Sequence, residues 1–267
     1  MFSSFMIHSW IVATIVAATA GLVGYFVVLR GASFAAHALP LSAFPGAAAA
    51  ALLGVNEIAG LVVFGVLGVL GIHGLSRQGR PEVATALTLV LLLGLGTLLL
   101  SLGQDYAQMV DALLFGQVLG VSRAEIVPIA VLSALAAGAT LMLLRPLLLS
   151  AVSPELARAR AIAPGRMDLV FLLILALAEI VALPVVGALL VFSLMVGPAS
   201  AARNLTDRPW LGLVLSVGLA LAIVWLALAL SYQTNWPIGF FVGGFGALAY
   251  ALGRAARSPA VWRLRLD

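Results

Sequence analysis

Three ionisable side chains lie within or beside long apolar runs of the sequence, and their chemistry suggests a site for a cation. They are His37 in SFAAHALPLSAFPG, Glu57 in GVNEIAG and Glu179 in LALAEIVALPVVG. Imidazole nitrogen and carboxylate oxygen are ligands of divalent metal ions, and both groups can exchange protons. Because an ionisable group inside an apolar span is costly, each is a candidate functional residue. Each also has a structural explanation, which is a helix–helix hydrogen bond for His37 and Glu179 and a solvated helix end for Glu57.

The composition indicates a protein that lies within a membrane. Of the 267 residues, 63% are hydrophobic and 9% are charged, whereas soluble domains have about 25% charged residues. The apolar runs extend along the whole chain, which predicts one all-α, polytopic transmembrane domain over residues 1–267. The basic residues are all arginine and stand at the ends of apolar runs, which favours topology signals over a nucleic-acid partner. The absence of cysteine excludes disulfides and thiolate metal ligands.

The apolar runs predict about nine membrane spans, since a spanning helix needs roughly 20 apolar residues. They are Trp10–Leu29, His37–Gly54, Ile58–Leu75, Val83–Leu102, Ile126–Leu144, Leu169–Ala182, Val185–Ala202, Leu211–Ser231 and Ile238–Leu252. The sixth and seventh runs are short and are separated by Leu183-Pro184, so eight full crossings with one re-entrant segment is the alternative. The stretch Asp105–Glu125 is expected to form a short surface or re-entrant helix.

The arginines predict the orientation in the membrane. Alternation of nine spans places on one side Arg30, Arg77, Arg80, Arg145, Arg158, Arg160, Arg166, Arg203, Arg208, Arg254, Arg257, Arg263 and Arg265. Arg123 falls on the other side. The positive-inside rule then predicts a multi-pass protein of the cell membrane with its N-terminus outside and its C-terminus in the cytoplasm.

The largest inner loop, LLLSAVSPELARARAIAPGRMD, predicts a short cytoplasmic helix. Ser153 is suited to cap it, Pro154 to begin it, and Glu155 to interact with the positive end of the helix dipole. We expect Pro164-Gly165 to end it. The residues between include Leu156, Arg158, Ala159 and Arg160. A helix this short needs a surface to rest on, so the segment is either a connecting loop or a docking element for a cytosolic motor.

The chain cannot contain a GxxxxGK[ST] phosphate-binding loop, because it has no lysine. Any ATP hydrolysis must therefore take place on a partner chain. We expect no enzymatic activity and no resident cofactor in this chain.

Three stretches of sequence occur in a characteristic order. They are VVLRGASFAAHALPLSAFPGAA, LLFGQVLGVS, and SPELARARAIAP followed by VVGALLVFSLMVGPASAAR. Together they resemble the zinc/manganese/iron-type permeases of ABC importers, the ABC-3 family, over nearly the whole chain. The resemblance implies a homodimeric pore that works with an ABC ATPase subunit and an extracytoplasmic substrate-binding protein. It implies inward movement of a divalent metal ion by alternating access.

The resemblance also assigns roles to segments. The helix near Ser153–Ile162 would be the coupling helix that seats in the ATPase, and the helix with Gly187, Gly197 and Pro198 would lie beside the pathway. A Gly-Pro pair removes a backbone donor and loosens a helix, so these residues are candidates for gating. A kink without gating is the alternative.

The sequence departs from the family at the usual metal ligands. Metal-importing members typically carry Asp-x-x-x-His before Pro-Gly, and the i, i+4 spacing lets both side chains bind one cation. Alignment on Pro45-Gly46 places His37 at the aspartate position and Leu41 at the histidine position. We therefore expect His37 to be a metal ligand or a packing residue, with Glu57 and Glu179 as weaker candidates. The identity of the ion stays open.

Two other classes of function remain alternatives. One is a secondary transporter or channel that works alone, with His37 and Glu179 as proton-linked residues. The other is a membrane scaffold, for which both residues would be dispensable. Dependence on an ATPase subunit separates the first from an ABC permease.

Overall fold

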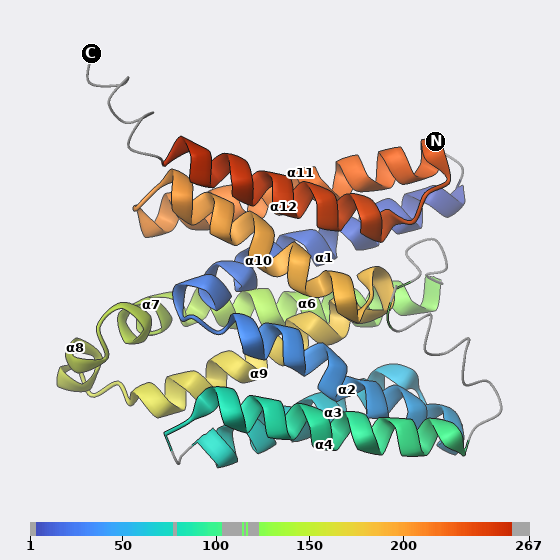
Figure 1. Cartoon of the computed structure of the whole chain (residues 1–267), viewed down its shortest axis with the longest axis horizontal. Coiled ribbons are helices and arrows are strands. Elements are labelled where there is room, and N and C mark those ends of the chain that lie inside the picture. The colour runs from blue at the N-terminus through green and yellow to red at the C-terminus, as the bar shows by residue number, and fades with distance from the viewer. Residues whose placement is uncertain (1–3, 77–78, 103–113, 115, 117–122, 258–267) are drawn as a thin grey trace.

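The computed structural model describes residues 4–76, 79–102, 114, 116 and 123–257, and this part of the chain folds into helices without strands (Figure 1). The helices are α1 (Ser4–Leu29), α2 (Ser33–Leu53), α3 (Glu57–Ser76), α4 (Pro81–Ser101), α6 (Arg123–Met142), α7 (Leu144–Val152), α8 (Pro154–Ala159), α9 (Pro164–Val186), α10 (Ala188–Leu205), α11 (Pro209–Thr234) and α12 (Ile238–Ala256). The all-α prediction is confirmed.

Among the described residues, eight helices are long and apolar enough to cross a membrane, namely α1, α2, α3, α4, α6, α9, α11 and α12. Helix α10, with 18 residues, is outside that set but also runs from one end of the bundle toward the other (Figure 1). The prediction of a polytopic protein with eight to nine spans is therefore confirmed. The predicted helix in the outer stretch Asp105–Glu125 lies mostly outside the described residues.

The boundary between the sixth and seventh spans differs from the prediction. Helix α9 begins at Pro164 and continues through Pro184, so the sixth span has 23 residues and is not short. Pro164 begins this helix because the first helical position needs no backbone donor. The break falls at Gly187, whose φ of 87° lies in a region that L side chains rarely adopt.

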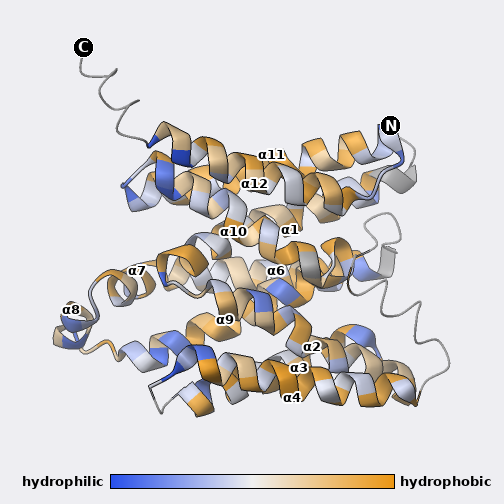
Figure 2. Cartoon of the chain, viewed as in Figure 1, coloured by the Kyte–Doolittle hydropathy of each residue, from blue (hydrophilic) through white to orange (hydrophobic). Residues whose placement is uncertain are grey.

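The helices form two packed groups, seen at the top and the bottom of Figure 1. Helices α2, α3 and α4 pack against one another, as do α1, α10, α11 and α12, while α9 contacts members of both groups. Glycines allow close helix approach: a Cβ on Gly46 of α2 would overlap the Gly60 carbonyl oxygen of α3. Between the helix ends most residues are hydrophobic (Figure 2).

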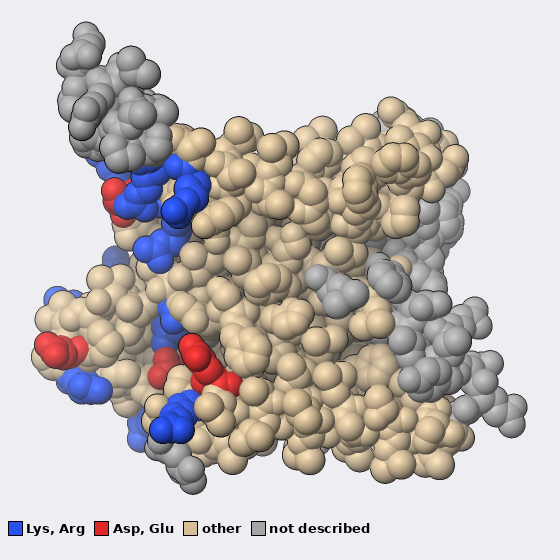
Figure 3. All heavy atoms as spheres, viewed as in Figure 1, with Lys and Arg blue, Asp and Glu red and all other residues tan. Residues whose placement is uncertain are grey.

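On the face shown in Figure 3, the charged residues gather at the end of the bundle that carries α8. That end holds the α1–α2 turn, the α3–α4 connection, the region from α7 to the start of α9, the α10–α11 connection and the end of α12. Arg123 begins α6 at the opposite end. The described arginines thus follow the predicted one-sided pattern, whereas Arg77, Arg263 and Arg265 lie outside the described residues.

Candidate functional site

His37 faces the neighbouring helix α10. It lies in the second turn of α2 and is half-buried, and its ring centroid is 5.4 Å from that of Phe192 in an edge-to-face arrangement. Leu41, one turn further along α2, is half-buried and packs on an apolar cluster. The structure thus directs His37 into the helix bundle.

The oxygen groups near His37 in the sequence are already used in the helices. The Ser42 hydroxyl donates to the Ala38 carbonyl at 2.8 Å, and the Asn56 side-chain oxygen accepts from the backbone amide of Ile58 at 2.9 Å. Asn56 therefore caps the start of α3. Neither group is directed at the imidazole as a second ligand.

Glu57 lies far from His37. It is exposed in the first turn of α3, beyond the far end of α2. Leu53 ends α2 sixteen residues after His37, which is about 24 Å along the helix at 1.5 Å per residue. Glu57 lies beyond that end. Over the described residues there is no group of three or more His, Asp or Glu side chains that could hold a metal ion.

Glu179 is buried inside the bundle. Its side chain lies in α9 with 1% of the residue exposed, and neither carboxyl oxygen has a hydrogen-bond partner among the described residues. Its helix neighbours Leu175 and Leu183 are buried apolar residues of the core. The interhelical hydrogen bond expected for a purely structural glutamate is therefore not formed in this part of the chain.

The break between α9 and α10 contacts Gly116, in the segment that connects α4 and α6. Gly116, with φ of 71°, lies directly on the backbone of Val186 and Gly187, and a Cβ at Gly116 would overlap both. Leu114 packs on the apolar cluster that includes Phe44 and Leu183. The sequence singled out Gly187 but gave no signal for this contact, because its partner is distant in the chain.

Gly197 and Pro198 lie within α10. A Cβ at Gly197 would be 3.0 Å from the Gly246 Cα of α12, so this glycine allows the two helices to pack closely. Pro198 continues the helix without a backbone donor. The structure gives both residues a packing position, and their role in gating stays a prediction.

Helix α8 matches the expected short helix at the arginine-rich end. The Ser153 hydroxyl accepts from the Leu156 backbone amide at 3.3 Å, Pro154 occupies the first turn, and Glu155 follows it. The helix ends at Ala159, earlier than expected, because Ala161 adopts φ of 58°. Pro164 therefore begins α9 and does not terminate α8.

One face of α8 is available to a partner. Ala157 is fully buried toward α7 and α9, whereas Leu156 is 47% exposed. The side chains of Glu155, Arg158, Ala159 and Arg160 are also exposed. The segment is thus a capped helix on the bundle surface, with an apolar side chain among charged ones.

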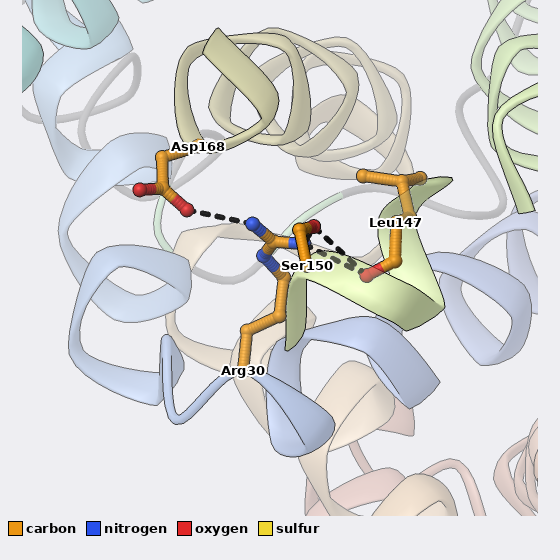
Figure 4. A network of polar contacts seen from close by, with 4 residues as sticks. All are labelled: Arg30, Leu147, Ser150 and Asp168. Carbon is orange, nitrogen blue, oxygen red and sulfur yellow. Dashed lines mark hydrogen bonds and ion pairs between the residues drawn. The ribbon is translucent and has the colours of Figure 1, made fainter. Parts of the chain in front are cut away.

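Arg30 makes side-chain contacts with two helices that are distant in the sequence, α7 and α9 (Figure 4). Its Nη1 donates to the Leu147 carbonyl at 3.1 Å and to the Ser150 hydroxyl at 3.0 Å, and its Nη2 is 2.6 Å from Asp168 Oδ1. The guanidinium carbon lies 5.1 Å from the centroid of the Phe171 ring. Sequence reasoning treated Arg30 only as a topology signal, because its partners are more than 100 residues away.

A cavity of about 430 Å³ adjoins this cluster. Arg30, Asp168 and Phe171 line one side, and His73, Ser76 and Glu82 from α3 and α4 are among the residues on the other. The arginine-rich end of the bundle is therefore hollowed between the α1–α2 turn and the α3–α4 pair.

Comparisons with known proteins agree with this architecture. The sequence model of the ABC 3 transport family matches residues 2–252. The manganese import system permease protein ScaB of Streptococcus parasanguinis is 27% identical over 242 residues, which cover 88% of this chain and 84% of that protein. A probable iron transport system membrane protein of Haemophilus influenzae is 27% identical over 237 residues, which cover 88% of this chain and 87% of that protein.

The fold is also found among solved structures. The structure of PsaBC from Streptococcus pneumoniae in complex with Fab superposes with a TM-score of 0.84 at 24% identity, covering 94% of this chain and 91% of that one. At this identity the likeness establishes the fold.

Proposed function

The chain belongs to the ABC 3 transport family, and from this premise we propose that it is the membrane-spanning subunit of an ABC importer for a divalent metal ion. The observation that carries the proposal is the family match over nearly the whole chain, with relatives named for manganese import and iron transport. We propose an ion of the manganese, iron and zinc class. ATP hydrolysis is assigned to a separate subunit, since a chain without lysine has no phosphate-binding loop.

We propose that α8 is the coupling helix that docks on the ATPase. Its support is a serine cap, one buried face and an exposed Leu156 at the arginine-rich end of the bundle. By the positive-inside rule this end is cytoplasmic, which places the N-terminus outside. An extracytoplasmic substrate-binding protein would then meet the opposite end, and two copies of this chain would form the pore.

We propose that His37 contacts the ion within the pathway. Support comes from its half-buried position and its orientation toward α10, the helix that follows the break at Gly187. Glu57, exposed at the opposite end, would attract cations there, and Glu179 would supply a buried carboxyl. A stand-alone transporter would use His37 and Glu179 as proton-linked residues, and it differs in needing no ATPase.

The test is metal uptake into proteoliposomes that contain the permease, its ATPase subunit and its receptor. Separate assays with Mn²⁺, Fe²⁺ and Zn²⁺ should show uptake of at least one ion that requires ATP inside and the receptor outside. Uptake that persists without the ATPase subunit would instead support the stand-alone transporter. If the complex hydrolyses ATP but takes up none of the three ions, the metal assignment is overturned.

A further inference from the structure

We propose that Arg30 is a positioning residue that joins the coupling helix α8 to α2, the helix that carries His37. The inference rests on the proposed role of α8 as the docking helix. It assigns a task in energy coupling to a side chain that belongs neither to α8 nor to α2.

The first argument is the arrangement of the Arg30 contacts around α8. Leu147 and Ser150 lie on α7, immediately before α8, while Asp168 and Phe171 lie on α9, immediately after it. One guanidinium thus contacts both segments that flank the coupling helix (Figure 4). A displacement of α8 that moves α7 or α9 must either break these contacts or move Arg30.

The second argument is that the α7 contacts are buried and depend on arginine chemistry. The Arg30 side chain is 6% exposed, and Leu147 and Ser150 are buried. A planar guanidinium can donate to two sides at once and stack on an aromatic ring, which a lysine ammonium cannot do in the same geometry. Asp168 is 59% exposed, so solvent weakens that ion pair more than the α7 hydrogen bonds.

The third argument is that the backbone around Arg30 can transmit a movement. The turn is closed by hydrogen bonds from Arg30 N to Phe26 O at 2.9 Å and from Ala32 N to Val27 O at 2.9 Å. Gly31 adopts the left-handed conformation, with φ of 66°, that such a helix end requires. Helix α2 begins at Ser33, and His37 follows Arg30 by seven residues, so the turn and the first turns of α2 should move together.

The fourth argument is that this end of the bundle has space for movement. The 430 Å³ cavity separates the Arg30 cluster from the residues of α3 and α4 that line its other side. The α1–α2 turn can therefore shift with α7 and α9 without first displacing a packed helix from that side. Beside the direct packing of α2 on α9, Arg30 is the polar link that ties the shift of α8 to the shift of α2.

The test compares Arg30→Gln with the parent in proteoliposomes that hold the complete complex, with Mn²⁺ as the transported probe. Mutations along a coupling network change the coupling by factors of roughly two to thirty. We expect Mn²⁺ imported per ATP hydrolysed to fall by such a factor, while ATP hydrolysis and ATPase binding persist. Arg30→Lys should restore little of the loss.

Arg257, whose side chain is more exposed than that of Arg30, supplies an arginine control at the same end of the bundle. It pairs with Asp207 at 3.1 Å and donates to the Arg203 carbonyl at 3.3 Å, but it flanks α10 and α12 instead of α8. Arg257→Gln should leave Mn²⁺ imported per ATP at the parental value. An equal loss in this variant would show a general effect of arginine removal and overturn the assignment to Arg30.

A distance measurement tests the link directly. Because this chain contains no cysteine, spin labels can be placed on cysteines introduced at Phe34 and Ala159, both exposed, without a background from the permease itself. In the parent complex the distance between these labels should stay the same with and without ATP, because α8 and the start of α2 move together. In Arg30→Gln it should change on ATP binding; an ATP-independent distance in that variant would overturn the proposal.

A second variant covers the case in which Arg30→Gln does not fold. Asp168 is more exposed than Arg30, and Asp168→Asn keeps the shape of its side chain. We expect this variant to lose less Mn²⁺ import per ATP hydrolysed than Arg30→Gln. Import per ATP at the parental value would contradict the link through α9. Failure of the proposed function looks different: the parent would import no Mn²⁺, or α8 would not bind the ATPase. The label distances in the ATP-bound complex would still report on Arg30 if another ion were the substrate.

Discussion

Replacement of the buried glutamate by an apolar side chain of similar shape should make the protein more stable. Glu179 is 1% exposed, and neither carboxyl oxygen has a hydrogen-bond partner in the described structure. A buried polar group without a partner costs about 1–3 kcal/mol. Methionine has a comparable unbranched shape and no group to satisfy, so Glu179→Met should raise the free energy of unfolding by about 1–3 kcal/mol.

The assay is reversible unfolding in mixed micelles, followed by circular dichroism. Leu175, fully buried one turn earlier on the same helix, provides the reciprocal control. Leu175→Gln introduces an amide at a similar depth and should lower the free energy of unfolding by a similar amount, about 1–3 kcal/mol. The two variants together separate the cost of the polar group from the effect of any change in α9.

Metal uptake by the same variants tests whether the carboxyl has a function. If it has, Glu179→Met should be more stable than the parent and import less metal. The stability of Glu179→Gln should lie between those of the parent and Glu179→Met. A loss of stability in Glu179→Met would refute the reasoning, because it would mean that the carboxyl has a favourable partner in the assembled protein. Gained stability with parental uptake would show that Glu179 has no role in the pathway.

Three further predictions address helix α8, the pathway and the orientation. Ala159→Pro removes the backbone donor of the last residue of α8 and should sharply reduce ATPase association in a pull-down, with the protein still in the membrane; unchanged association and uptake would reduce α8 to a connecting loop. His37→Ala should lower metal uptake but leave ATPase association intact, and parental uptake of every tested ion would make His37 a packing residue. A reporter that is active only outside the cell, fused after Asp267, should be silent, and strong activity there would contradict the predicted orientation.

Much of the fold could be predicted from the sequence because the lipid bilayer imposes a simple rule on it. The lengths of the apolar runs gave the spans, and the arginines at their ends gave the alternation, since both depend on local composition. The capped start of α8 was also local, because Ser153 bonds a backbone amide only three residues away. The error at the sixth span came from reading Pro184 as a helix break, although neighbouring helices allow a proline to continue a buried helix.

The candidate site was only partly predictable. His37 and Glu179 were recognisable as unusual side chains in apolar runs, but their surroundings were not. The edge-to-face contact of His37 with Phe192, and the absence of a described partner for Glu179, depend on how α2, α9 and α10 lie against one another. Sequence spacing also placed Glu57 among the candidate ligands, whereas the length of α2 carries it to the other end of the bundle.

The sequence by itself determined the membrane class, the number of candidate spans among the described residues to within one, the arginine-rich end and the capped helix α8. Each of these follows from hydropathy, charge or hydrogen bonds between residues close in the chain. Only the tertiary structure decided which distant residues meet: Arg30 with Leu147, Ser150 and Asp168, and Gly116 with the α9–α10 break. These contacts require the helices to pack first, because apolar surfaces of similar composition can pack in many registers, and the packed arrangement then brings the polar groups together.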